Sequence, residues 1–167
     1  IGFVPQKPVI FSGTIADNIR FGCEEADDEE VRQAAEIAQA AEFIEAMKDG
    51  YDSVIEQGST NLSGGQKQRL AIARALVRRP EIYIFDDCFS ALDFKTDARL
   101  RTALKKRIEG AGALVVAQRV ATVMNADRIV VLDEGRVAGT GTHRELMNTC
   151  EVYREIVYSQ LSEEELA

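Results

Sequence analysis

Two groups of residues have the types and spacing needed to handle a phosphate group and its metal ion. The first is Leu62-Ser63-Gly64-Gly65-Gln66, a hydroxyl and two glycines at the start of a strongly helical segment. The first N–H groups of a helix have no intrahelical acceptor, and the positive end of the helix attracts anions. Glycines let phosphate oxygens approach the backbone closely. Alone, the string fits equally well a plain capping box of the S-x-x-Q kind between Ser63 and Gln66.

The second group is a pair of carboxylates after an apolar run. Asp86 and Asp87 directly follow Ile82–Phe85. A carboxylate at the C-terminal end of a buried parallel strand lies where α/β proteins bind ligands, and carboxylate oxygens suit Mg²⁺. An isolated Asp-Asp after a strand is more often a turn or a helix cap, so its position soon after the glycine-rich helix start is what favours the metal site.

These residues need strands and helices to position them. Continuous apolar runs predict strands covered on both faces, as in a parallel sheet, at 1–4, 82–85, 113–117 and 128–132, with an edge strand at 136–141. A short helix is predicted from Thr14, which forms a capping box with Asp17, through Arg20. Two more helices are predicted between 28 and 47. The remaining helices are predicted from Ser63 to about 79 and at 95–108, 120–124, 143–147 and 151–161. Residues 50–61 are predicted to be a loop. This alternation predicts an α/β layered domain.

Composition excludes several classes of protein. The chain has 167 residues, enough for one domain with its own core, and its net charge is −8. Acidic clusters at 24–30 and 163–165 argue against nucleic acid as a partner. No apolar run approaches ~18 residues, and no signal peptide is visible. The three cysteines have no metal-ligand spacing, so free thiols are expected. The first residues read as a strand entered partway, so we expect a truncated chain.

Several strings together resemble the ABC ATPases. The fifteen residues Leu62–Leu76 resemble the family's signature motif, Ile82–Asp87 its Walker B strand, Ser90–Asp93 its D-loop, and Val4–Gln6 its Q-loop; Phe11–Ile19 resembles the exporter branch. The resemblance extends from Gln6 to about Leu161. Only 55 residues separate Gln6 from Leu62, which leaves room for a compact helical subdomain but not for the long coiled-coil arms of chromosome-maintenance or DNA-repair members.

The resemblance implies a fold and a set of ligands. The fold is α/β, a partial P-loop NTPase core with a parallel sheet, formed by 1–11 and 81–167, plus a helical subdomain at about 12–80. The implied cofactors are ATP and Mg²⁺, with Mg²⁺ held by Gln6 and by Asp86 through a water. The implied nucleotide-binding residues are Gln6, Ser63, Gly64, Gly65, Gln66, Asp86 and Asp93; the D-loop that contains Asp93 contacts the opposing subunit. The implied partners are a second nucleotide-binding domain and the transmembrane domains, at the cytoplasmic face of the cell membrane.

The chain departs from the family pattern in three places. It contains no G-x-x-x-x-G-K-[ST] string, so the phosphate-binding loop, Walker A, and the strands before it are expected to lie outside this chain. We therefore expect the fragment alone to lack tight ATP binding and to be inactive as an ATPase. We also expect its unpaired strand edges to favour self-association.

The other two departures fall on the catalytic positions. Asp87 stands where the family usually has a glutamate, and Gln118, in Ala117-Gln118-Arg119, stands where it has a histidine. Aspartate is one methylene shorter, and a displacement of about 1 Å can cost about a hundredfold in rate. Glutamine can hydrogen-bond a γ-phosphate but cannot carry a positive charge. His143, the only histidine, is interpreted as a capping or surface residue.

An intact signature beside two altered catalytic positions predicts an unequal pair of sites. The chain would complete an ATP site in a different partner chain of a heterodimeric exporter, while its own site is weakened. Two alternatives stay open: a non-hydrolytic, ATP-gated regulatory module, and a soluble ABC protein without membrane segments. The exporter-like segment 11–19 argues against the second alternative.

Overall fold

The computed structural model describes residues 1–160, which form two compact units, one over residues 1–116 and one from residue 117 onward. The acidic cluster predicted at 163–165 and the last residue of the final predicted helix, Leu161, lie outside the described residues. No helix in the described part combines the length and the apolarity needed to cross a membrane.

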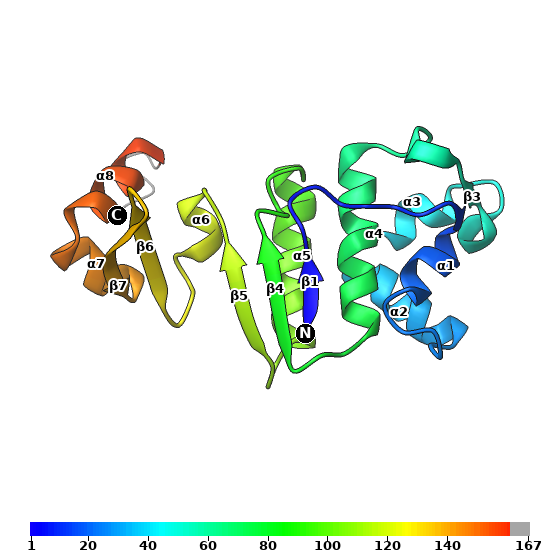
Figure 1. The fold of residues 1–167 in the computed structure, drawn as a ribbon, viewed down its shortest axis with the longest axis horizontal. Coiled ribbons are helices and arrows are strands. Elements are labelled where there is room, and N and C mark those ends of the chain that lie inside the picture. Colours follow the sequence, from blue (N-terminus) through cyan, green and yellow to red (C-terminus); the bar gives the residue numbers. More distant parts are fainter. Residues whose placement is uncertain (161–167) are drawn as a thin grey trace. The chain divides into compact units, whose positions relative to one another are not determined.

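The first unit contains a three-stranded parallel sheet in the order β1-β4-β5 (Figure 1). Its strands are β1 (Gly2–Val4), β4 (Ile82–Asp86) and β5 (Gly112–Val116). The register pairs Val4 with Phe85 and Asp86 with Val116. The parallel sheet predicted from the apolar runs is therefore confirmed for these three strands, and their carboxyl ends lie at one edge.

Helices α1 (Ile15–Arg20), α2 (Asp28–Ile37), α3 (Ala41–Glu45) and α4 (Gly64–Val77) precede β4. Figure 1 shows α4 standing between the sheet and the other three helices. The predicted capping box at Thr14 and Asp17 is present, as is the predicted helix start at Ser63. α4 is the central element because its apolar side is buried nearly throughout, at Leu70, Ala71, Ile72, Ala73, Ala75, Leu76 and Val77. α5 (Phe94–Arg107) follows β4 and contributes Leu100 and Leu104 to the same core.

The segment predicted as a loop at 50–61 contains short regular pieces. Two 3₁₀ turns, Gly50–Asp52 and Gln57–Ser59, flank β3 (Val54–Ile55), which pairs antiparallel with β2 (Gly13–Thr14). The Ile15 amide donates to the Ser53 carbonyl at 3.1 Å. A two-residue strand is too short to show periodicity, which is why the sequence pattern did not reveal it.

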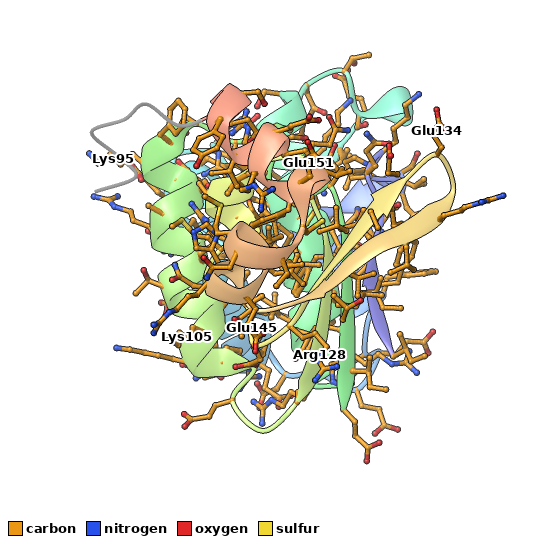
Figure 2. The ribbon with its side chains drawn as sticks, turned by 90° about the vertical axis from the view of Figure 1, so that its left-hand side faces the viewer. Lys95, Lys105, Arg128, Glu134, Glu145 and Glu151 are labelled. Carbon is orange, nitrogen blue, oxygen red and sulfur yellow. The ribbon has the colours of Figure 1, made fainter. Side chains whose placement is uncertain are left out.

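The second unit contains α6 (Val120–Val123), a hairpin, and two closing helices, α7 (His143–Thr149) and α8 (Glu151–Gln160). The hairpin joins β6 (Ile129–Asp133) to β7 (Arg136–Gly141), and Figure 2 shows Glu134 at its tip. Glu134 and Gly135 both have positive φ, 45° and 76°, as a tight hairpin turn between twisted strands requires.

The expectation that every apolar run is covered on both faces is wrong for β5 and β6. In β6, Ile129 and Val131 are buried, whereas Val130 is 53% exposed and Leu132 is 67% exposed. Within the described residues β6 pairs only with β7, and in antiparallel orientation. In β5, Leu114 and Val116 are exposed. In β6 only the face with Ile129 and Val131 packs on an apolar cluster, which includes residues of α8, and in β5 only Val115 packs on the core of the first unit.

The three cysteines are free thiols, as predicted. Cys88 lies just after β4 and is buried, and burial raises the pKa of its thiol to about 12, with the nearby Asp87 and Asp86 carboxylates adding to the shift. The thiol is therefore neutral at physiological pH and acts as a small apolar side chain.

Candidate nucleotide site

The start of α4 contains the glycine-rich string. Ser63 is the N-cap residue, and its Oγ accepts from the Gln66 amide at 3.3 Å while Gln66 Oε1 accepts from the Ser63 amide at 2.8 Å. The capping box is thus present. It occupies only the Gln66 amide, so the N–H groups of Gly64 and Gly65 lack an intrahelical acceptor. Ser63 is exposed and its hydroxyl retains a proton to donate. The helix cap is therefore compatible with an anion site at the same helix end.

The two glycines of this string have different surroundings. A Cβ atom on Gly65 would lie 3.3 Å from the Ala91 carbonyl oxygen and 3.8 Å from Leu92 Cδ2, so this glycine allows α4 to pack on the segment before α5. A Cβ atom on Gly64 would meet nothing within 4 Å. Glycine weakens a helix relative to alanine, so no contact within the described chain explains Gly64. Open space here suits a group that approaches from outside the chain.

The same helix holds the segment that contains Gln6. Gln68 is buried, at 1% exposure, and its Nε2 donates to the Pro5 carbonyl at 3.2 Å. Arg74 Nη1 donates to the Val9 carbonyl at 2.8 Å. These two bonds fix the backbone on both sides of Gln6 against α4. The backbone around Gln6 is therefore tied to the helix that begins at Ser63.

Arg74 also joins α4 to α1. Its Nε donates to the Asn18 carbonyl at 2.8 Å, and its Nη2 donates to Asn18 Oδ1 at 2.9 Å. The guanidinium carbon lies 4.8 Å from the Phe11 ring centroid and 5.6 Å from that of Phe21. Burial lowers the pKa of Arg74, but arginine remains charged at any physiological pH. One cation therefore satisfies three acceptors and stacks on two rings.

We expect Arg74→Leu to lower the free energy of unfolding by about 2–4 kcal/mol, because buried acceptors on Asn18 lose a charged donor. Arg78 lies four residues further along and is exposed, so Arg78→Leu is the matched control and should change stability by less than about 0.5 kcal/mol. Urea denaturation followed by circular dichroism measures both. Equal effects of the two variants would contradict the role given to Arg74.

The carboxyl end of β4 brings Gln6 and Asp87 together. Asp86 is the last residue of β4, and the Asp87 amide donates to the Val116 carbonyl at 2.9 Å, which ties it to the end of β5. Gln6 Nε2 donates to Asp87 Oδ2 at 3.2 Å, across 81 positions of sequence. Asp87 has φ of 41°, a left-handed conformation that aspartate tolerates better than most residues. Asp87, which the resemblance puts at the catalytic position, is thus hydrogen-bonded to Gln6, which the resemblance puts at the Mg²⁺ ion.

Asp93 has a structural contact of its own. It is the N-cap of α5, and its Oδ1 accepts from the Thr96 amide at 2.9 Å. That backbone hydrogen bond lowers the pKa of the Asp93 carboxyl. Asp93 is exposed, and the Leu92 side chain beside it is buried.

The second unit contains Gln118 and His143. Gln118 lies two residues beyond the end of β5, is exposed, and its carbonyl accepts from Gln160 Nε2 at 2.8 Å. His143 is the first residue of α7, after the cap Thr142, and its Nδ1 lies 2.8 Å from the Tyr153 hydroxyl. The prediction of a capping or surface residue is therefore wrong in detail, because Thr142 is the cap and His143 is half-buried against a tyrosine.

Comparison with known proteins now decides the family. The profile of the family described as "ABC transporter" matches residues 1–90. The chain belongs to the ABC transporter family. It is 45% identical over 163 residues to an uncharacterized ABC transporter ATP-binding protein of Mycobacterium tuberculosis, covering 96% of this chain and 28% of that protein. It is 48% identical over 160 residues to the mitochondrial potassium channel ATP-binding subunit of Homo sapiens, covering 96% of this chain and 22% of that protein.

A solved structure of an ABC transporter also matches. It is described as a bacterial Atm1-family ABC exporter with ATP bound, with a TM-score of 0.91 and 38% sequence identity over 97% of this chain and 28% of that one. The ABC transporter fold predicted for this chain, including its parallel sheet and helices, is confirmed. The chain spans roughly a quarter of the length of these relatives.

The residues of this ABC transporter chain that could hold Mg²⁺ and a phosphate lie at the ends of β1 and β4 and at the start of α4. Among the described residues no three His, Cys, Asp or Glu side chains form a metal cluster. Mg²⁺ keeps several waters and takes one or two protein ligands plus phosphate oxygens. Asp86 and Gln6, at the carboxyl ends of β4 and β1, are the residues that would hold it. The helix end at Gly64 offers N–H donors to a phosphate.

Sequence reasoning missed Gln68, Arg74 and Gln160. Each acts on the backbone of a segment distant in sequence. The only signal in the sequence was a charged residue among apolar neighbours, at Arg74, and it carried no indication of a partner.

Proposed function

We propose that this chain is the ATP-binding and ATP-hydrolysing part of an ABC exporter, which couples ATP binding and hydrolysis to export of a substrate across a membrane. The observation that carries the proposal is the helix start at Ser63, where Gly64 faces open space and two N–H groups lack an intrahelical acceptor. The match to an Atm1-family exporter with ATP bound supports it. The site would lie at the cytoplasmic face of the membrane, with the transmembrane domains contacting the segment around Gln6.

The proposed site is composite. Two nucleotide-binding domains meet head to tail, and the start of α4 in this chain contacts the terminal phosphate of an ATP held by the other domain. The family resemblance assigns Asp86, Asp87, Gln6 and Gln118 to this chain's own ATP and its Mg²⁺. Asp93 precedes α5 on a loop that packs under Gly65 through Ala91, so it lies near the same interface. Tight binding of ATP by this chain alone is not expected.

The substitutions at Asp87 and Gln118 support a partner of a different sequence. Both fall on the chain's own ATP site, while the residues at 62–66 serve the partner's site and match the family pattern. A pair of identical chains would have two weak sites. We therefore propose a heterodimer in which this chain's own site retains its ATP, while the partner's site, completed by residues 62–66 of this chain, hydrolyses a second ATP.

Single-turnover hydrolysis by the assembled, full-length transporter tests this proposal. With two ATP molecules bound, we expect phosphate release to stop at about one per heterodimer on the fast timescale, the second ATP being retained. Equal and fast hydrolysis of both molecules would refute the asymmetry. Failure of the assembly to bind ATP at all would refute the proposed function.

A second candidate function is a non-hydrolytic module in which ATP binding alone acts as a gate. The substitutions at Asp87 and Gln118 favour it, and one relative is named an ATP-binding subunit of a potassium channel. The same experiment separates the two candidates, because a gating module would bind two ATP molecules and release no phosphate.

The isolated chain is also proposed to self-associate. Leu114 and Val116 of β5 are exposed, and β5 has no partner on its outer edge among residues 1–160. An unpaired apolar edge strand pairs readily with another chain. A monomer at high concentration in light scattering would count against this.

A further inference from the structure

Gln160, the last residue of α8, forms hydrogen bonds to the backbone on both sides of Arg119. Gln160 Nε2 donates to the Gln118 carbonyl at 2.8 Å, and Gln160 Oε1 accepts from the Val120 amide at 2.9 Å. Both ends of one amide are therefore used on a segment of three residues. We call residues 118–120 the switch segment, because Gln118 occupies the family's switch position.

The switch segment needs this contact because α6 has a weak start. α6 is four residues long, and its N-cap residue, Arg119, makes no side-chain cap hydrogen bond. The Val120 amide is the first N–H of the helix and has no intrahelical acceptor. So short a helix is not stable on its own. Gln160 supplies the missing acceptor from a different helix, so the start of α6 depends on α8.

Gln160 is held in place by the packing of α8. Tyr153 and Val157 of α8 are buried, and they belong to the same apolar cluster as Val120, Ile129 and Val131. Gln160 lies one turn beyond Val157 on this packed helix. The side-chain amide of Gln160 therefore links the position of α8 to the backbone of the switch segment.

We propose that Gln160 is a positioning residue for the switch segment: by fixing the Gln118 carbonyl and the Val120 amide, it sets the backbone conformation from which the Gln118 side chain extends. The inference rests on the proposed function, which puts Gln118 near the terminal phosphate of this chain's ATP. The side-chain amide of glutamine donates from its NH₂ group and accepts at its carbonyl oxygen, so one side chain makes both bonds. Glutamate keeps the acceptor for Val120 but sets a carboxylate oxygen against the Gln118 carbonyl, and methionine removes both bonds while keeping the stem.

The test uses the full-length assembled transporter with Gln160→Met and Gln160→Glu. Glu155→Gln is the matched control, since Glu155 is an exposed residue of the same helix. Two quantities are measured: hydrogen exchange of a peptide covering 117–121, and the rate at which retained ATP leaves after a chase with unlabelled ATP. We expect both to rise by about fivefold in Gln160→Glu, which loses one hydrogen bond, and by more in Gln160→Met, which loses two. Glu155→Gln should match the wild type.

Two outcomes overturn the inference. Unchanged exchange would show that Gln160 does not hold the switch segment. Faster exchange with unchanged ATP release would reduce Gln160 to a purely structural cap. The wild-type assembly tests the proposed function separately. A wild type that retains no ATP would refute that function, and this inference with it.

Discussion

Replacing Asp87 by glutamate is expected to raise the rate of hydrolysis at this chain's own ATP site by ten- to a hundredfold. The added methylene moves the carboxylate forward by roughly 1 Å, and misplacement on that scale costs about a hundredfold. Gln6 Nε2 donates to Asp87 Oδ2 at 3.2 Å, so the present carboxylate is hydrogen-bonded to a residue just beyond β1. A base must reach its water before its pKa matters. Single-turnover phosphate release from the full-length assembly measures the change.

Asp87→Asn is the matched control, because it keeps the length of the side chain and removes the negative charge. It should lower the residual rate at this site, and a rate equal to wild type would show that Asp87 takes no part in hydrolysis. Asp87→Glu should also cost stability, on the order of 1 kcal/mol, because φ is 41° at this position and glutamate tolerates left-handed backbone less well than aspartate. A glutamate variant with unchanged turnover would contradict the argument from side-chain length.

The pairing of Gln6 with Asp87 marks the boundary of what sequence alone could predict. Helix caps such as Thr14 with Asp17, and Ser63 with Gln66, were predictable because each pair lies within one turn. The hydrogen bond between these two residues, 81 positions apart, was not predicted, because the family resemblance only assigned both of them to a nucleotide site. The apolar periodicity of a segment predicts that it is a strand, but it does not predict which other strand becomes its neighbour.

The errors have a common physical origin. β5 and β6 look like fully buried strands because an apolar run does not reveal how many of its faces have a covering element. Leu132, 67% exposed, is as apolar as Val131, which is buried. The contacts made by Gln68, Arg74 and Gln160 were missed for a related reason. Each satisfies a backbone group, and every residue in the chain offers the same backbone groups.

Gly64→Ala offers the sharpest separation of folding from function in this chain. Alanine favours a helix over glycine by about 1 kcal/mol at most, and a Cβ atom at this position would meet nothing within 4 Å. The variant should therefore unfold at the same temperature as the wild type or slightly higher. If a phosphate from the partner's nucleotide approaches this N–H group, the same methyl group lies in its path. ATP hydrolysis by the assembly should then fall by on the order of a hundredfold, as expected for loss of a donor to a reacting phosphate.

Gly65→Ala is the informative comparison, because its Cβ atom would lie 3.3 Å from the Ala91 carbonyl and would strain the packing of α4 on the segment before α5. That variant should lose stability and activity together. A loss of activity in Gly64→Ala without loss of stability cannot come from misfolding, so it would assign the open space at this helix end to a ligand. Full activity in Gly64→Ala would mean that nothing approaches the helix there, and the composite site proposed for this chain would have to be abandoned.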